Sequence, residues 1–279
     1  MNKKNKKGIK ADYQAKNLKN PFYRATKKKK KGRLRVVIFF ALIFVVALFW
    51  LIFAAPFLEI NKIEITGLER VKETEINNIF KDQKAESKAL ILKENNFFLF
   101  DSEEFENKLI NNYNFAQVKV RKKFPDTLSV IISERPYAFI FQEGTNFYFA
   151  SADAYIIKDE AVSEEAKNRY FILENRSQIV KITDNGKINI KPDYLDFIFA
   201  LHTELTKYPD LKLKRLIIEQ ELNSVLVELD NGPLVYFNSQ KDPIIQVEDL
   251  ALVKKEKIGD NFSSTKYIDL RYGNMIYIN

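Results

Sequence analysis

The chain has 279 residues, of which 46% are hydrophobic and 13% aromatic, and this composition excludes a wholly disordered protein. It contains no cysteine, which excludes disulfides, thiolate metal ligands and a cysteine nucleophile. The net charge of +8 comes from the N-terminus, because residues 1–35 hold 15 of the 45 basic side chains and a single acid, Asp12. Residues 59–279 carry 30 basic and 36 acidic side chains, so the rest of the chain is mildly acidic.

Residues 1–35 are predicted to form a basic cytoplasmic tail that is disordered in isolation, because they contain too few large apolar side chains to build a core. The run Lys27 to Lys31 has two interpretations. It could contact nucleic acid, but we favour a role in membrane topology, with attraction to anionic headgroups, since no folded nucleic-acid motif accompanies it. No specific nucleic-acid partner is therefore predicted.

Residues 36–58 form an uncharged apolar run, and we predict that this run is a transmembrane helix. About 20 apolar residues span the hydrocarbon core of a bilayer as a helix. Two alternatives are a cleavable signal peptide, whose apolar region is usually only about 7–15 residues long, and a buried core helix. Because basic residues stay on the cytoplasmic side, the N-terminus is expected inside and residues 59–279 outside the cell membrane.

The next stretch, residues 59–135, alternates strand and helix patterns. Asp101 is a good N-cap for the second helix, with Glu104 three residues later. Phe124-Pro125-Asp126 favours a turn between the last two strands. The expected elements, in the order β-α-α-β-β, are a strand at 59–67, helices at 72–80 and 101–113, and strands at 117–121 and 127–134.

Residues 136–279 are richer in aromatic strand patterns, and we predict a mostly antiparallel sheet domain with helices, which makes the chain α+β. Residues 158–168 are expected to be a loop, 170–173 a brief apolar run, and 174–187 the least structured part. Strands are expected at 137–141, 147–149, 155–157, 213–219, 224–229, 234–237 and within 266–279, and helices at 194–208 and 242–255.

Several phrases in this region resemble the FtsQ/DivIB family of cell-division proteins. They are Ile63-x-Ile65-x-Gly67, the Phe124-Pro125-Asp126-Thr127-Leu128 turn followed by Glu134-Arg135-Pro136, and Tyr267-Ile268-Asp269-Leu270-Arg271-Tyr272 near the end. The resemblance implies a POTRA domain at 59–135 and an FtsQ/DivIB-type β domain at 136–279. Residues 158–220 match that family only in their expected order of elements.

The resemblance also implies a function. It predicts a non-catalytic, single-span scaffold at the division septum that binds FtsB/DivIC-like and FtsL-like proteins and helps recruit or regulate septal peptidoglycan synthases. The last strand is apolar and uncharged, so it could accept a partner strand at an open sheet edge, although it could also be central and covered. Carried over to matching positions, the partner-binding residues are Arg271, Tyr272, Gly273, Asn274, Met275, Ile276 and Tyr277.

Two other classes of function remain open. A paired-carboxylate cell-wall glycan hydrolase needs only two acids some 5–10 Å apart, and the sequence has many acids. A POTRA-type chaperone or transport component is disfavoured, because no second POTRA domain or β-barrel pattern follows. His202 is the only histidine, and we predict no enzyme, no catalytic residue, no cofactor and no metal ligand.

Overall fold

The computed structural model describes residues 31–279 apart from 55, 90–91, 94, 159–160, 221–222 and 274. The expectation of a disordered tail falls on residues 1–35, of which 1–30 lie outside the described residues. Residues 1–52 and 53–279 are two separate units, and each is described by itself.

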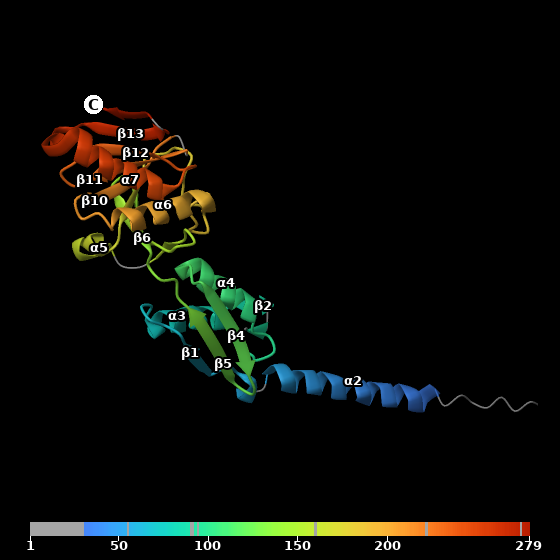
Figure 1. Cartoon of the computed structure of the whole chain (residues 1–279). Coiled ribbons are helices and arrows are strands. Elements are labelled where there is room, and N and C mark those ends of the chain that lie inside the picture. Colours follow the sequence, from blue (N-terminus) through green and yellow to red (C-terminus); the bar gives the residue numbers. More distant parts are fainter. Residues whose placement is uncertain are drawn as a thin grey trace, which may run out of the picture. The chain divides into compact units, whose positions relative to one another are not determined.

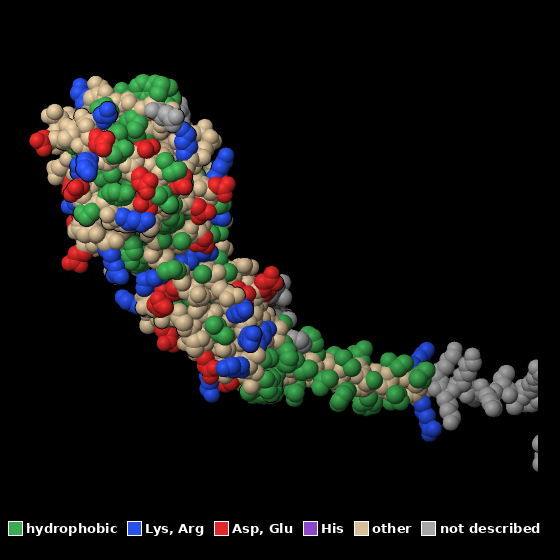
Figure 2. All heavy atoms as spheres, viewed as in Figure 1, with side chains coloured by type: hydrophobic (Ala, Val, Ile, Leu, Met, Phe, Trp, Pro, Cys, Tyr) green, Lys and Arg blue, Asp and Glu red, His purple; other side chains and the backbone are tan. Residues whose placement is uncertain are grey.

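The first unit is dominated by one apolar helix, α2 (Lys31–Ala54) (Figure 1). Its segment Gly32–Ile52 is long and apolar enough to cross a membrane, and none of it is buried. Hydrophobic side chains cover its surface (Figure 2). The helix begins and ends earlier than the apolar run: it ends just before Pro56, which lacks a backbone N–H, and the 3₁₀ helix η1 (Pro56–Leu58) follows.

The second unit begins with a POTRA-like domain in the predicted order β-α-α-β-β. Its three-stranded sheet has the order β1-β5-β4, with β1 parallel and β4 antiparallel to β5. Two short strands between the helices form a hairpin that the sequence analysis did not predict. The elements are β1 (Lys62–Thr66), α3 (Glu73–Ala85), β2 (Ser87–Ala89), β3 (Leu92–Lys93), α4 (Ser102–Tyr113), β4 (Gln117–Lys123) and β5 (Thr127–Ser133).

The core of this domain lies between the helices and the sheet. Side chains alternate along β4, with Val118 and Val120 buried between exposed polar neighbours. Ile76 of α3 and Phe105 and Leu109 of α4 are fully buried against them. Asp101 caps α4 as predicted, since its carboxylate accepts hydrogen bonds from the backbone N–H groups of Glu103 (3.1 Å) and Glu104 (3.0 Å).

The rest of the second unit is built on a nine-stranded mixed sheet in the order β14-β13-β12-β11-β10-β9-β6-β7-β8. Among the described strands, five neighbouring pairs are antiparallel and three are parallel. The strands are β6 (Phe139–Glu143), β7 (Asn146–Ala150), β8 (Ile156–Ile157), β9 (Ile172–Asn175), β10 (Leu213–Ile218), β11 (Ser224–Leu229), β12 (Leu234–Asn238), β13 (Tyr267–Tyr272) and β14 (Met275–Ile278).

Helices α6 (Pro192–Leu205) and α7 (Pro243–Val253) pack side by side on this sheet (Figure 1). They bury Ile198, Leu201, Val247 and Leu250 against strand residues of the main core. In both helices a proline occupies the first helical position, where a missing N–H costs nothing. α6 therefore begins at Pro192, two residues before the expected start at 194, and it ends at Leu205 and not at 208.

Two further local expectations were wrong. The charged segment 158–168, expected to be a loop, contains the helix α5 (Glu164–Arg169), which starts because the Ser163 hydroxyl caps the N–H of Ala166. The last helix was expected to reach residue 255, but α7 ends at Val253 and passes into the π-helical turn η2 (Lys254–Ile258) and the 3₁₀ helix η3 (Gly259–Ser264).

The described contacts also join the POTRA-like domain to the larger sheet. Asn114 donates a buried hydrogen bond from its amide Nδ2 to the carbonyl of Ile156 (2.7 Å). The carbonyl of Asn114 accepts a hydrogen bond from Nε of Arg135 (2.9 Å), and Arg135 forms an ion pair with Asp153. The Arg135-Pro136 connection is therefore held by polar contacts on both sides.

Candidate partner-binding edge

The C-terminal edge of the large sheet is formed by a hairpin. After β12 the chain runs through α7, η2 and η3 to β13, which pairs parallel to β12. β14 then folds back antiparallel to β13, with Asp269 opposite Tyr277 and Tyr272 opposite Met275. Gly273 turns the hairpin at φ +72°, a conformation that glycine adopts without strain.

Among the described strands, β14 pairs only with β13, so its other side is a sheet edge. The alternative of a central, covered last strand therefore does not describe its place in the fold. The strand contains no charge and no proline, which are the usual protections of an edge. Its backbone is available for pairing with another extended segment.

The side chains of the hairpin differ in exposure. Tyr272, Met275 and Tyr277 are 56%, 60% and 49% exposed. Ile276, between two of them, is half-buried and packs against the main core. The edge thus presents an apolar surface on one face, while Ile276 anchors β14 on the other.

Two aromatic rings organise the exposed face. Tyr272 of β13 and Tyr277 of β14 meet edge to face, with ring centres 5.5 Å apart. Since they come from opposite strands, this contact also stabilises the hairpin. It presents a small aromatic surface next to the open strand.

Arg271 points along its own strand. Its guanidinium donates hydrogen bonds to Asp269, at 2.9 Å to Oδ1 and 2.7 Å to Oδ2, and lies 4.6 Å from the ring centre of Tyr236. Burial acts to raise the pKa of Asp269, but the hydrogen bonds from Arg271 outweigh it and lower that pKa below its ordinary value. Arg271 thus pairs with Asp269 within β13 and also lies 5.7 Å from the ring centre of Tyr272.

The structure thus brings most of the seven residues singled out from the sequence into one hairpin, in three different environments. Tyr272, Met275 and Tyr277 are exposed, Arg271 is paired with Asp269, and Ile276 faces the core. Asn274 lies outside the described residues. Ile278, which is 45% exposed, was not among the seven predicted residues, although the uncharged run 275–278 already marked it as part of the strand.

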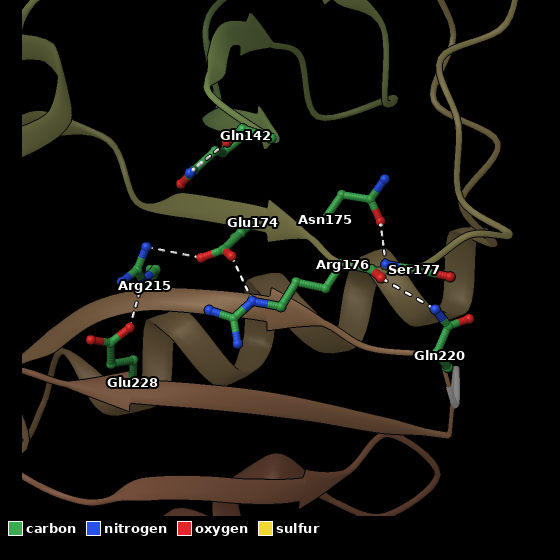
Figure 3. A network of polar contacts seen from close by, with 9 residues as sticks. Gln142, Glu174, Asn175, Arg176, Ser177, Arg215, Gln220 and Glu228 are labelled. Carbon is green, nitrogen blue, oxygen red and sulfur yellow. Dashed lines mark hydrogen bonds and ion pairs between the residues drawn. The ribbon is translucent and has the colours of Figure 1, made fainter.

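Elsewhere on the sheet, a network of ion pairs joins Glu174 of β9, Arg215 of β10 and Glu228 of β11 (Figure 3). Arg215 reaches between Glu174, at 2.9 Å from Nη1, and Glu228, which it holds through Nε. Arg176 pairs with Glu174 as well (2.6 Å). The hydrogen bond from Arg215 lowers the pKa of Glu228, whereas the general acid of a glycosidase needs a raised pKa.

His202 packs against an aromatic side chain. Its ring is 4.5 Å from that of Phe171, and burial lowers its pKa. Among the residues that the structure describes, no three histidine, aspartate or glutamate side chains come together in a way that could hold a metal ion. The hairpin edge is accordingly the site that the geometry favours.

The fold and this edge define a class: a chain with one apolar N-terminal helix, a POTRA domain, and a mixed sheet ending in an open hairpin. Residues 58–135 match the family model described as "POTRA domain, FtsQ-type". The chain is also distantly homologous to a DivIB cell-division protein over 90% of its length, which confirms the resemblance found in the sequence.

Three such relatives illustrate the similarity. The DivIB protein of Clostridium botulinum is 24% identical over 260 residues, which cover 90% of this chain and 93% of that protein. The DivIB protein of Bacillus anthracis is 27% identical over 47% of this chain and 45% of its own length. The one from Clostridium acetobutylicum is 24% identical over 37% of this chain and 38% of its own length.

Proposed function

We propose that this chain is a non-catalytic, single-span protein of the bacterial division machinery, and that β14 binds a partner strand. The observation that carries the proposal is the open, uncharged edge of β14 with its exposed Tyr272, Met275 and Tyr277. The distant homology to DivIB proteins supports the cellular role. The expected partners are FtsB/DivIC-like and FtsL-like division proteins.

The binding mechanism follows from the edge. An added strand would take up the open row of backbone N–H and C=O groups of β14, which supplies affinity without regard to sequence. Specificity would come from side chains, since every second residue of the partner meets the Tyr272–Tyr277 face. The partner's apolar side chains would cover surface that is exposed in the structure.

The rest of the chain would place this edge outside the cell. Residues 36–58, most of which lie in α2, would anchor the protein in the plasma membrane, with the basic residues 1–35 in the cytoplasm. The POTRA domain (59–135) and the β domain (136–279) would lie on the outer side, at the division septum. There the protein would help recruit or regulate septal peptidoglycan synthases.

The proposal is tested by measuring binding of the full-length protein, in lipid nanodiscs, to the exported parts of the same cell's FtsB-like and FtsL-like pair. Met275→Glu and Tyr277→Lys place a charge in the apolar contact without touching the core. Each is expected to weaken binding at least about tenfold, the effect of losing a central contact. The matched control is Leu252→Glu on α7, where the native residue is 52% exposed, a value between those of Met275 and Tyr277.

The control variant is expected to bind as the wild type does. Circular dichroism establishes that all variants are folded. Binding that survives both edge substitutions would contradict a site at β14, and a wild-type protein that does not bind the pair would contradict the proposed function as a whole.

A further inference from the structure

A second exposed apolar surface lies where η1 meets the POTRA domain. Three phenylalanines are exposed there: Phe57 by 60%, Phe98 by 55% and Phe124 by 70%. Hydrophobic side chains gather at this end of the domain in the space-filling view (Figure 2). We call these three residues the aromatic end.

Backbone hydrogen bonds connect the three segments that carry these residues. The N–H of Phe97 donates to the carbonyl of Leu58 (2.7 Å), which joins the turn at 95–99 to η1. The N–H of Asn61 donates to the carbonyl of Asp126 (2.9 Å), which joins the chain after η1 to the turn between β4 and β5. The aromatic end is therefore built on a fixed backbone.

Phe97 lies between the exposed rings. It meets Phe98 edge to face at 5.5 Å and Phe124 at 5.8 Å, measured between ring centres. Phe97 itself packs against the domain core, so it supports the outer two rings. Phe98 and Phe124 are exposed on the side of Phe97 that faces away from the core. An exposed apolar surface of this kind marks a contact site.

Charges around the cluster fit an interface between lipid and water. The Lys122 ammonium lies 5.8 Å from the ring centre of Phe97. Lys123, next along the chain, is paired with Glu64 at 2.6 Å, and Glu59 accepts a hydrogen bond from Asn95. Aromatic rings with basic residues beside them are typical of protein surfaces at the headgroup level.

The covalent chain determines where this end can go. Phe57 is five residues beyond Ile52, the last residue of the segment able to cross a membrane, so a fully extended link reaches at most about 18 Å. If α2 spans the bilayer, the aromatic end is confined close to the outer surface. This step rests on the anchoring proposed above.

We infer that the aromatic end binds the outer leaflet of the membrane, with Phe57, Phe98 and Phe124 inserted at the headgroup level. Interfacial apolar faces enter the headgroup and acyl boundary by about 5–10 Å, a depth that phenylalanine rings can reach. This contact keeps the η1 end of the POTRA domain at the membrane surface.

Tryptophan fluorescence tests this inference in the full-length protein, because Trp50 in α2 is the only tryptophan. The protein is reconstituted in phosphatidylcholine and phosphatidylglycerol vesicles whose acyl chains are brominated near the headgroup. Phe98→Trp and Phe124→Trp are made separately in a Trp50→Phe background. The control is Ile179→Trp in the β domain, where the native side chain is 59% exposed.

Bromine is expected to reduce the emission of the Phe98→Trp and Phe124→Trp proteins at least about twofold, as for rings within the interface, and to leave the Ile179→Trp protein unchanged. Quenching of the two probes no stronger than that of the control overturns the inference, and a surface that faces a protein partner would give this result. Trp50 in the otherwise unchanged protein reports anchoring separately. If Trp50 is not quenched the anchor itself has failed; if Trp50 alone is quenched, only the aromatic end has failed.

Discussion

At the residue scale, the motif residues of the POTRA domain have definite structural tasks. Glu134, whose side chain is 2% exposed, accepts hydrogen bonds from the backbone N–H groups of Glu69 (2.9 Å) and Val71 (3.2 Å) and pairs with Arg70 (3.1 Å). A buried carboxylate needs this number of partners to offset its lost hydration. Glu134 thereby ties the end of β5 to the loop after β1.

Gly67 begins the same loop, and no other residue fits there. Its φ is +89°, and a Cβ at this position would lie 2.0 Å from the carbonyl oxygen of Ile132. We expect Gly67→Ala to lower the free energy of unfolding by about 1–3 kcal/mol or more, because the clash is with backbone that cannot rotate away. Urea unfolding of the protein measures this effect.

Gly144→Ala is the matched control for that prediction. Gly144 also has a positive φ, +59°, but nothing lies within 4 Å of its added Cβ. Its substitution should cost only the conformational part, about 1 kcal/mol. Equal losses at the two positions would show that the close approach to Ile132 does not matter.

At the element scale, an ion pair on β13 supports the β13–β14 hairpin. Asp269 is buried at 6% exposure and is held by Arg271 and its backbone N–H (3.0 Å). The pair keeps β13 in register beside β12, whose Tyr236 contacts the guanidinium. The edge strand β14 is thus attached to the sheet through β13, which the Asp269 carboxylate stabilises.

Acid is therefore expected to weaken this element. The pKa of Asp269 is lower in the folded protein than its ordinary value of 3.8, so its contribution to stability is complete well above pH 4 and is lost as the pH falls through the folded pKa. The stability of the wild type should fall between about pH 5 and pH 2 more steeply than that of Asp269→Asn. Thermal unfolding over this range makes the comparison, and parallel curves would contradict the prediction.

Helices and strands were predicted with different success along the chain. α4 and α7 were placed correctly at their starts because Asp101 and Asp242 are capping residues whose carboxylates do accept backbone N–H groups. α5 was missed since six residues are too few to show a helical period. The end of α7 was misplaced because the helical pattern continues smoothly into η2.

At the scale of the whole molecule, the polar contacts at Asn114 connect the POTRA domain to the large sheet. Asn114 is buried, has a positive φ of 54°, and reaches Ile156 through its side chain. A Cβ added at Gly186 would collide with the same amide, 2.2 Å from Nδ2, so the loop around Gly186 packs closely on it. Asn114 therefore joins the POTRA domain to the large sheet through a defined hydrogen bond and close packing.

Asn114→Gly keeps the positive φ accessible and removes only the side chain, so it isolates these contacts. We expect faster backbone hydrogen exchange at residues 114–116 and 154–157, and a loss of about 1–3 kcal/mol in the free energy of unfolding, because the carbonyl of Ile156 loses its buried donor. Asn231→Gly is the control, since Asn231 has a similar φ of 56° but lies exposed in a turn. Equal exchange in both variants would mean that the side chain of Asn114 does not hold the connection.

Residue patterns alone were enough for the apolar helix, the order of elements in 59–135, the N-cap Asp101 and the family resemblance, because each is built from short segments whose pattern is local. Only the tertiary structure decided that β14 forms the edge of the sheet, that Arg271 lies over the ring of Tyr236 in β12, and that Phe97 meets Phe124 beside η1. These features join segments far apart in the chain. Strand order and long-range packing depend on how whole elements bury one another, which local periodicity does not encode.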